Sequence, residues 1–272
     1  MSDHESGNVV FGKHSLHFMR MGRGKKLLLA FHGYSNDAGL FTPIAPYLEQ
    51  DYTFISIDLP FHGSSKWQQE VLLTRKDLQL LIETLKKEFK TDKVSLLGYS
   101  LGGRVCLTIL ELMPESIDKV LLIASDGLVF NYFYYFLTRT SLGNALFRRF
   151  ASGPQRYVHL IQWLRKHKWL DASRYKFVMR YVHTDESREF LLNVWMSVSE
   201  IIPHHGKVKG YIKQYNIPVH IFMGTYDRVI PMKNAEHFAK GVHDDVQLHI
   251  LEKGHDLFDP ETLPQMAECL LY

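Results

Sequence analysis

The sequence predicts an α/β fold with a mostly parallel central sheet, helices on both faces of that sheet, and an inserted helical cap. Two observations carry this prediction. Continuous apolar runs, typical of strands buried on both faces, alternate with runs whose apolar residues recur at helical spacing. A Gly-Tyr-Ser-Leu-Gly pentapeptide, residues 98–102, lies between one strand-like run and one helix-like run. Strands that alternate with helices favour a parallel sheet.

The predicted elements follow one another in a regular order. Residues 8–20 alternate between apolar and polar side chains, which predicts an antiparallel hairpin at an edge of the sheet. Residues 78–89 and 105–113 have the spacing of helices. Buried strands are expected at residues 26–31, 53–57, 94–97, 120–124, 219–223 and 246–251.

The regular alternation stops between residues 124 and 219, where no strand-like run occurs and the pattern is mostly helical. Residues 139–213 carry 14 Lys and Arg against 5 Asp and Glu, a net charge of +9, so the rest of the chain carries −6. The same segment is rich in Phe, Tyr and Trp. We therefore predict an α/β core formed by residues 1–125 and 206–272, and a helical cap inserted at residues 126–205.

The bulk composition narrows the class of protein. A chain of 272 residues, 46% of them hydrophobic, is long enough to bury a sizeable core. Its net charge of +3 gives no reason to expect nucleic acid as a partner. With two cysteines, Cys106 and Cys269, a disulfide framework is excluded. The first seven residues are polar and no apolar run reaches the length of a membrane span, so we expect a cytoplasmic protein.

Ser100, at the centre of the pentapeptide, is the expected nucleophile. A serine on a tight turn from strand to helix projects its hydroxyl above the sheet, where a base can reach it. Asp227 and His255 each follow the end of a predicted strand. Because the carboxyl ends of parallel strands meet at one edge of the sheet, we expect Ser100, His255 and Asp227 to act as nucleophile, base and acid.

An acyl-transfer site also needs donors for the oxyanion. The backbone N–H groups of Leu101, directly after the nucleophile, and of Tyr34, in the loop after the strand at residues 26–31, are the expected donors. We expect neither a metal nor an organic cofactor. Asp244, Asp245 and Asp256 are expected to be solvated, and His204 and His205 to be solvated or structural. His62 could line the pocket, but a turn-stabilising role is the favoured one.

The motifs resemble, in type and order, those of the α/β-hydrolase fold superfamily, in its single-domain form with a helical cap. The resemblance covers essentially the whole chain outside the cap. It rests on His32-Gly33, residues 58–65 (Asp-Leu-Pro-Phe-His-Gly-Ser-Ser), residues 98–103, residues 224–231 and Gly254-His255. The second motif usually reads D-x-P-G-H-G-x-S in the superfamily, so Phe61 here replaces a glycine. Branches that act on epoxides and haloalkanes carry Asp at the elbow, so Ser100 implies a serine hydrolase.

The predicted function is therefore hydrolysis of a carboxylic ester or thioester with a small to medium hydrophobic acyl group, through an acyl-enzyme. Two alternatives stay open, because the fold does not fix the reaction. One is a C–C bond hydrolase or lyase that acts on an activated ketone or acid with the same triad. The other is a non-catalytic ligand-binding member of the fold. Nothing in the sequence indicates the oligomeric state.

The basic cap has three interpretations. A solvated helical surface whose aromatic side chains pack on the core is the favoured one. The cap could also recognise an anionic acyl substrate, or make a weak contact with an anionic membrane surface. Charge reversal at Arg148, Arg149, Arg165 and Lys166 separates the first interpretation from the other two.

Overall fold

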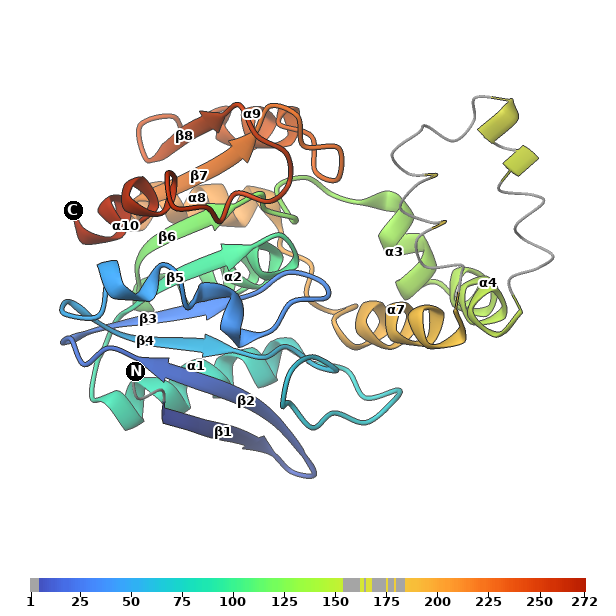
Figure 1. Cartoon of the computed structure of the whole chain (residues 1–272), viewed down its shortest axis with the longest axis horizontal. Coiled ribbons are helices and arrows are strands. Elements are labelled where there is room, and N and C mark those ends of the chain that lie inside the picture. Colours follow the sequence, from blue (N-terminus) through green and yellow to red (C-terminus); the bar gives the residue numbers. More distant parts are fainter. Residues whose placement is uncertain (1–4, 154–161, 164, 168–174, 176–178, 180–183) are drawn as a thin grey trace. The chain divides into compact units, whose positions relative to one another are not determined.

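One mixed sheet of eight strands lies at the centre of the larger of two units (Figure 1). The computed structural model describes residues 5–153, 162–163, 165–167, 175, 179 and 184–272. We call Met1–Gln68, Leu73–Phe130 and Ile201–Tyr272 the core unit, and Gln69–Leu72 with Asn131–Glu200 the insertion unit. The predicted boundaries of the cap, residues 126–205, remain a prediction.

The strands run in the spatial order β1-β2-β4-β3-β5-β6-β7-β8. The β1–β2 and β2–β4 pairs are antiparallel, and all pairs from β4–β3 to β7–β8 are parallel. The predicted mostly parallel sheet with an antiparallel edge hairpin is thus confirmed. The strands span Glu5–Phe11 (β1), His14–Met21 (β2), Lys26–Phe31 (β3), Tyr52–Ile57 (β4), Val94–Tyr99 (β5), Ile117–Ile123 (β6), Val219–Gly224 (β7) and Val246–Leu251 (β8).

The helices of the core unit cover both faces of the sheet. They are α1 (Arg75–Phe89), α2 (Leu101–Leu112), α8 (His205–Tyr215), α9 (Lys233–Ala239) and α10 (Leu263–Leu271). Helix α1 begins at a capping box in which Thr74 and Asp77 bond each other's backbone N–H groups. Helix α2 packs on β3, β5 and β6, and α1 and α8 flank it. Figure 1 shows these three helices behind the sheet.

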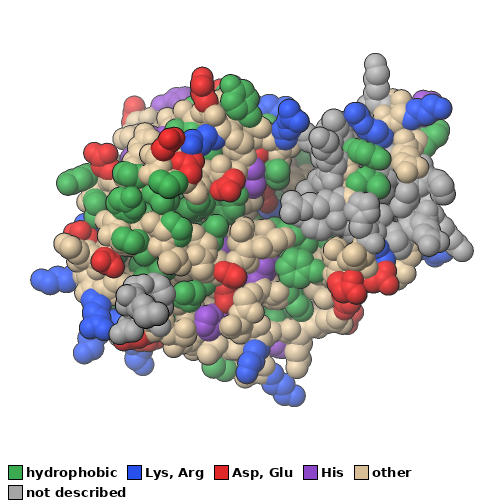
Figure 2. Space-filling model, viewed as in Figure 1, with side chains coloured by type: hydrophobic (Ala, Val, Ile, Leu, Met, Phe, Trp, Pro, Cys, Tyr) green, Lys and Arg blue, Asp and Glu red, His purple; other side chains and the backbone are tan. Residues whose placement is uncertain are grey.

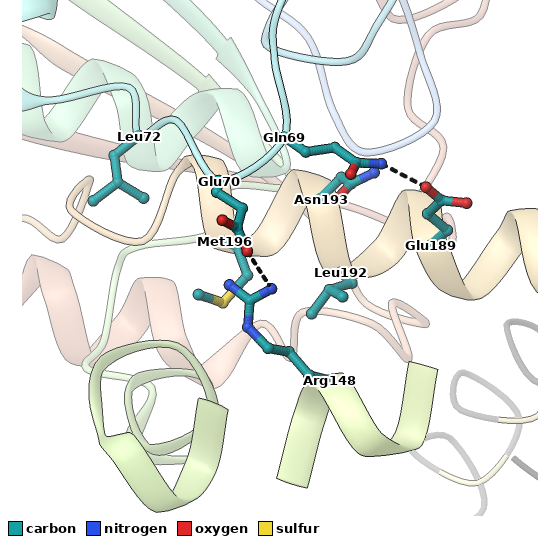
Figure 3. A pocket seen from close by; sticks show the side chains of 8 residues that line it. All are labelled: Gln69, Glu70, Leu72, Arg148, Glu189, Leu192, Asn193 and Met196. Atoms are coloured by element: carbon teal, nitrogen blue, oxygen red, sulfur yellow. Dashed lines mark hydrogen bonds and ion pairs between the residues drawn. The ribbon is translucent and has the colours of Figure 1, made fainter. Parts of the chain in front are cut away.

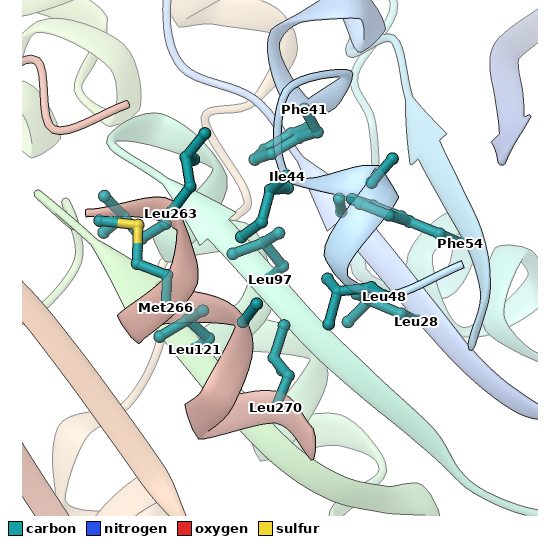
Figure 4. Close-up of a cluster of buried hydrophobic side chains, with 14 of the residues drawn as sticks. Leu28, Phe41, Ile44, Leu48, Phe54, Leu97, Leu121, Leu263, Met266 and Leu270 are labelled. Carbon is teal, nitrogen blue, oxygen red and sulfur yellow. The ribbon is translucent and has the colours of Figure 1, made fainter. Parts of the chain in front are cut away.

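The opposite face of the sheet is covered by α10 and the 3₁₀ segments Ala38–Phe41 and Ala45–Tyr47. Leu97 of β5 lies between Ile44 on one side and Met266 on the other (Figure 4). The hydroxyl of Tyr52, at the start of β4, donates a hydrogen bond of 2.6 Å to the backbone oxygen of Leu270. This buried bond ties the last helix to the centre of the sheet.

The described part of the insertion unit contains helices and no strand, as predicted. Its helices are α3 (Tyr132–Arg139), α4 (Ser141–Ser152) and α7 (Asp185–Ser197). The ring of Trp195 lies 5.3 Å from that of Tyr134 and 5.6 Å from that of Phe147. The Tyr134 hydroxyl also donates to the backbone oxygen of Trp195 at 3.0 Å. These three rings, one from each helix, thus pack together within the described part of the unit.

Two further sequence expectations have a clear outcome. Helix α2 begins at Leu101, directly after Ser100, and not at residue 105. Gly102 and Gly103 carry no apolar side chain, so the helical spacing of apolar residues becomes visible only from Val105. Cys106 and Cys269 are both free. Several basic and aromatic residues of the predicted cap lie outside the described residues: Arg156, Tyr157, Lys168, Trp169, Arg174, Lys176, Phe177, Arg180 and Tyr181.

Within the described residues, no helix combines the length and the apolar character needed to cross a bilayer.

Candidate active site

Ser100 occupies the sharp turn between β5 and α2. Its φ of 49° and ψ of −114° are unfavourable for a residue with a side chain, so the turn is strained. The close approach of α2 to the neighbouring strand requires Gly102, where a Cβ would overlap the carbonyl oxygen of Phe31. At Gly98, a Cβ would lie 2.7 Å from the Cα of Gly103. The two glycines of the pentapeptide therefore permit the turn that presents Ser100.

Three backbone hydrogen bonds fix the conformation of Ser100. Its N–H donates to the carbonyl oxygen of Ile123 at 3.0 Å, which connects the turn to β6. Its own carbonyl oxygen accepts from the N–H groups of Gly103 at 3.0 Å and Asp126 at 2.9 Å. Because buried backbone bonds of this kind are costly to break, they hold a strained serine in one orientation.

The structure brings Ser100, His255 and Asp227 together. Nε2 of His255 lies 3.1 Å from Oγ of Ser100, and Nδ1 of His255 lies 2.7 Å from Oδ2 of Asp227. Asp227 follows β7 and His255 follows β8, as the sequence predicted. The side chain of His255 is 23% exposed, whereas that of Asp227 is fully buried. A ligand can reach the serine and the imidazole, while the carboxylate is shielded from water.

The second carboxylate oxygen of Asp227 is held by its own loop. Oδ1 accepts from the N–H of Val229 at 2.7 Å and from that of Ile230 at 2.9 Å. These two bonds orient the carboxylate and satisfy its buried charge. On the other side of the imidazole, the Tyr99 hydroxyl donates to the backbone oxygen of His255 at 3.3 Å. The histidine loop is thereby tied back to β5.

Other acids near the site have different partners. Asp126, in the loop after β6, forms an ion pair with the buried guanidinium of Arg104. Asp256, next to the histidine, is exposed and accepts from the N–H of Phe258 at 3.2 Å. The geometry therefore selects Asp227 as the partner of His255.

The two predicted oxyanion donors follow neighbouring strands in register. Phe31 of β3 pairs with Gly98 of β5, so Tyr34 and Leu101 each stand three residues beyond a paired position. Leu101 is the first residue of α2, where the helix provides no acceptor for the N–H group. Their assignment as oxyanion donors remains a prediction.

Two buried histidines, His32 and His62, lie against the loop that follows β3, and their contact was not predicted from the sequence. Nε2 of His32 accepts from the N–H of Leu59 at 3.0 Å, and Nε2 of His62 accepts from the N–H of Ser35 at 3.3 Å. The two rings lie 4.8 Å apart. Burial lowers the pKa of His32 to about 4, and burial with the nearby His32 lowers the pKa of His62 to about 4. Both therefore act as neutral hydrogen-bonding groups that position the loop, and the His62 bonds fit its predicted turn-stabilising role.

The motif at residues 58–65 forms a compact turn around Asp58. The Asp58 carboxylate accepts from the N–H of Ala38 at 2.6 Å and of Ser64 at 2.8 Å, and Oδ2 lies 2.8 Å from Nδ1 of His17. Phe61 has a φ of 66°, the left-handed region in which a side chain is strained. The turn therefore keeps the shape that a glycine would allow, at a cost in strain.

The adjacent histidines at 204 and 205 are structural. Nδ1 of His204 accepts from the N–H of Lys207 at 3.2 Å and so caps α8. Nε2 of His205 lies 2.8 Å from the backbone oxygen of Gly127. Their rings serve different partners, which agrees with the structural role predicted for them.

A hollow in the insertion unit is formed without any of the triad residues (Figure 3). Arg148 pairs there with Glu70 at 3.0 Å, and Gln69 donates to Glu189 at 2.6 Å. Arg148 and Glu70 thus neutralise each other, whereas Glu189 bonds a neutral amide, and the residues that line the hollow include no nucleophile. The segment Gln69–Leu72 joins the insertion unit through these contacts.

A serine, a histidine and a buried aspartate at the ends of three parallel strands are the arrangement of a hydrolase with a nucleophile elbow. Residues 26–262 match the model of the alpha/beta hydrolase fold family, and the chain belongs to that family.

Individual relatives differ in how much of the chain they share. The uncharacterized hydrolase YugF of Bacillus subtilis (strain 168) is 24% identical over 256 residues, which are 89% of this chain and 87% of that protein. The serine hydrolase-like protein of Danio rerio is 29% identical over 105 residues. That match covers 37% of this chain and only 31% of the relative.

Solved structures agree on the fold. The carboxylesterase CesB (YbfK) from Bacillus subtilis superposes with a TM-score of 0.64 and 18% identity, covering 99% of this chain and 92% of the other. The thioesterase domain from the curacin biosynthetic pathway superposes with a TM-score of 0.63 and 16% identity, covering 99% of each chain. At these identities the likeness concerns the fold.

Proposed function

We propose that the protein is a serine hydrolase that cleaves a carboxylic ester or thioester with a small to medium hydrophobic acyl group. The observation that carries this proposal is the continuous chain of contacts from Oγ of Ser100 through His255 to Asp227, at 3.1 and 2.7 Å. A serine hydroxyl is a weak nucleophile until a base takes its proton, and this geometry supplies the base.

In the proposed reaction, Ser100 attacks the carbonyl carbon while Nε2 of His255 takes the hydroxyl proton. Asp227 stabilises the resulting imidazolium. The backbone N–H groups of Leu101 and Tyr34 are the proposed donors to the oxyanion. His255 then protonates the leaving alkoxide or thiolate, and an acyl-serine remains. In the second half, His255 activates water, the carboxylic acid leaves, and Ser100 regains its proton.

Labelling with a fluorophosphonate probe tests the nucleophile directly. We expect rapid stoichiometric labelling of the wild-type protein and none of Ser100→Ala. Ser152→Ala, which alters an exposed serine, serves as the matched control and should label like the wild type. Failure of the well-folded wild-type protein to label would support a non-catalytic member of the fold.

Substrate class is tested with p-nitrophenyl esters of increasing chain length, matched thioesters and vinylogous diketones. We expect turnover of the esters and thioesters. Turnover of the diketones alone would identify the C–C bond hydrolase.

We propose that exposed aromatic side chains at the start of α3 contribute to acyl-chain selectivity. Tyr132 and Phe133 are large, largely exposed apolar side chains in the insertion unit. Their replacement by serine should change the preference between short and medium chains by about tenfold. Leu80→Ser, which removes an exposed apolar side chain from α1, should leave that preference unchanged.

For the basic residues we propose a solvated surface. Arg139 lies 3.6 Å from Glu200 and Arg188 pairs with Asp185, so part of the positive charge is neutralised within the insertion unit. On the core unit, basic and acidic side chains are interspersed over the face seen in Figure 2. Charge reversal at the exposed Arg149, Arg165 and Lys166 should leave unchanged both the binding to anionic liposomes and the preference between neutral and anionic esters.

A further inference from the structure

Three side chains that commonly bind transition metals meet at a place separate from the triad. They are His220 of β7, His249 of β8 and Cys269 of α10. Nδ1 of His220 lies 3.1 Å from Nε2 of His249, and Sγ of Cys269 lies 3.8 Å from the same Nε2. All three ligand atoms lie within 4.8 Å of one another. Each side chain is partly exposed, so an ion from solution can reach them.

The fold explains why these residues converge although 49 positions separate the first from the last. In the parallel β7–β8 pair, His249 stands opposite Phe222. His220 lies two residues before Phe222 in β7, so the side chains of these two residues lie on the same face of the sheet. His220 and His249 are therefore diagonal neighbours on that face. The Phe222 ring stacks on that of His249 at 4.3 Å and limits its rotation. Helix α10 packs over this face and brings Cys269 to the pair.

The distances suit a single tetrahedral ion. With metal–nitrogen bonds of about 2.05 Å and a metal–sulfur bond of about 2.3 Å, neighbouring ligand atoms stand about 3.3 Å apart for N and N, and about 3.6 Å for N and S. The observed separations of 3.1 and 3.8 Å differ from these by a few tenths of an ångström. The ligand atoms of His220 and Cys269 lie within 4.8 Å of each other, and side-chain rotations would have to bring them to about 3.6 Å.

One cationic group lies beside the cluster, the ammonium of Lys119. The Lys119 ammonium donates to the backbone oxygen of Cys269 at 3.5 Å and is directed to the backbone.

We propose that His220, His249 and Cys269 form a binding site for one divalent transition-metal ion of borderline softness, such as Zn²⁺, with water as the fourth ligand. The N₂S donor set selects this class over Mg²⁺ and Ca²⁺, which prefer oxygen. Binding releases the thiol proton to solvent as the sulfur–metal bond forms. The bound ion would connect α10 to the β7–β8 edge of the sheet, and its role would be structural.

The direct test uses the full chain, stripped with a chelator and titrated with Co²⁺. We expect one equivalent to produce visible bands of a tetrahedral ion and a near-ultraviolet band of cobalt–thiolate charge transfer. Zn²⁺ should displace Co²⁺ and abolish both. At a free Zn²⁺ concentration about 100 times the Kd, the Tm should rise by about 5 °C.

Three variants assign the ligands. Cys269→Ser should lose the near-ultraviolet band, and His220→Gln and His249→Gln should each weaken binding by about 100-fold or more. His237→Gln, an exposed histidine of α9, is the control and should bind like the wild type. Ser100→Ala should also bind normally, which separates this site from the proposed hydrolase.

Absence of the thiolate band in the folded wild-type protein would overturn the proposal, and so would an affinity unchanged by Cys269→Ser. Because the bands are recorded on the wild-type chain, the test does not depend on the folding of any variant.

Discussion

The loops at the end of the sheet and the helices of the insertion unit hold their side chains in different ways. At the sheet, each triad residue follows a strand whose register is set by its neighbours, and buried hydrogen bonds fix Ser100 and Asp227. In the insertion unit, three rings centred on Trp195 hold the helices together, and α3 presents exposed aromatic side chains. Backbone geometry fixes the side chains at the end of the sheet, whereas packing between side chains fixes those in the insertion unit.

This difference has a functional lesson. Proton transfer tolerates little error in position, and the residues proposed for it stand on elements that the whole sheet fixes. Selection among apolar chains needs only apolar surface of suitable shape, which helices can change by substitution. We therefore expect changes at the strand ends to affect rate, and changes in the insertion unit to affect selectivity.

The largest expected effect is the loss of kcat on replacing His255, the proposed base. His255→Gln should lower kcat for ester hydrolysis by about 10⁴-fold or more, because no other group at this position can take the Ser100 proton. The adjacent Asp256→Asn is the matched control and should stay within about threefold of the wild type, since Asp256 is exposed. Equal losses in both variants would contradict the assigned triad.

The next effect tests whether the ring cluster stabilises the insertion unit alone. Trp195→Ala should destabilise that unit by about 3 kcal/mol, because it removes two ring contacts. Amide hydrogen exchange should become faster in α3, α4 and α7 and stay unchanged in α2. Tyr132→Ala, an exposed ring of α3, should change none of these rates. Faster exchange in α2 would mean that the two units unfold together.

An intermediate effect concerns the pH dependence of the core unit. Burial lowers the pKa of His62 in the folded protein to about 4, below its ordinary value of 6.5, so the unfolded chain binds a proton first on acidification. The contribution of His62 to the free energy of unfolding is fully present above pH 6.5 and is lost progressively as the pH falls towards 4. Between pH 7.5 and pH 5, the titration of His62 should lower the free energy of unfolding by about 2 kcal/mol.

Urea unfolding of the wild type and of His62→Gln at both pH values measures that loss, because glutamine keeps a donor and an acceptor but does not titrate. The glutamine variant should lose about 2 kcal/mol less than the wild type. His243→Gln, at an exposed position, should show the same change in the free energy of unfolding between the two pH values as the wild type. The same change in the free energy of unfolding in all three proteins would show that His62 is not buried as a neutral group.

The smallest effect is at the strained turn. Phe61→Gly and Phe61→Ala both remove the ring, but only glycine adopts a φ of 66° without strain. The glycine variant should therefore be more stable than the alanine variant by about 1 kcal/mol, measured by urea unfolding. A more stable alanine variant would show that the turn relaxes to negative φ.

Most of the sheet could be predicted because parallel strands are buried on both faces and leave continuous apolar runs, as at β3 and β5. The meeting of Ser100, His255 and Asp227 could be predicted because a turn tight enough for Ser100 leaves glycines beside it, and because Asp227 and His255 follow strand ends. Contacts that depend on packing could not be predicted. The bond from His62 to the loop after β3, the association of Gln69–Leu72 with the insertion unit, and the meeting of His220 with Cys269 leave no local pattern.

The loop that holds Asp227 influences which ring nitrogen of His255 carries the hydrogen when residue 227 is changed. Because Oδ1 accepts from the N–H groups of Val229 and Ile230, an asparagine at position 227 would keep its single carbonyl oxygen there. Its amide NH₂ group would then face Nδ1 of His255 and donate to it. The imidazole would change to the tautomer with its hydrogen on Nε2, which points a donor at Ser100 where a lone pair is needed. In that variant, two backbone amides would select the tautomer of a histidine that they do not touch.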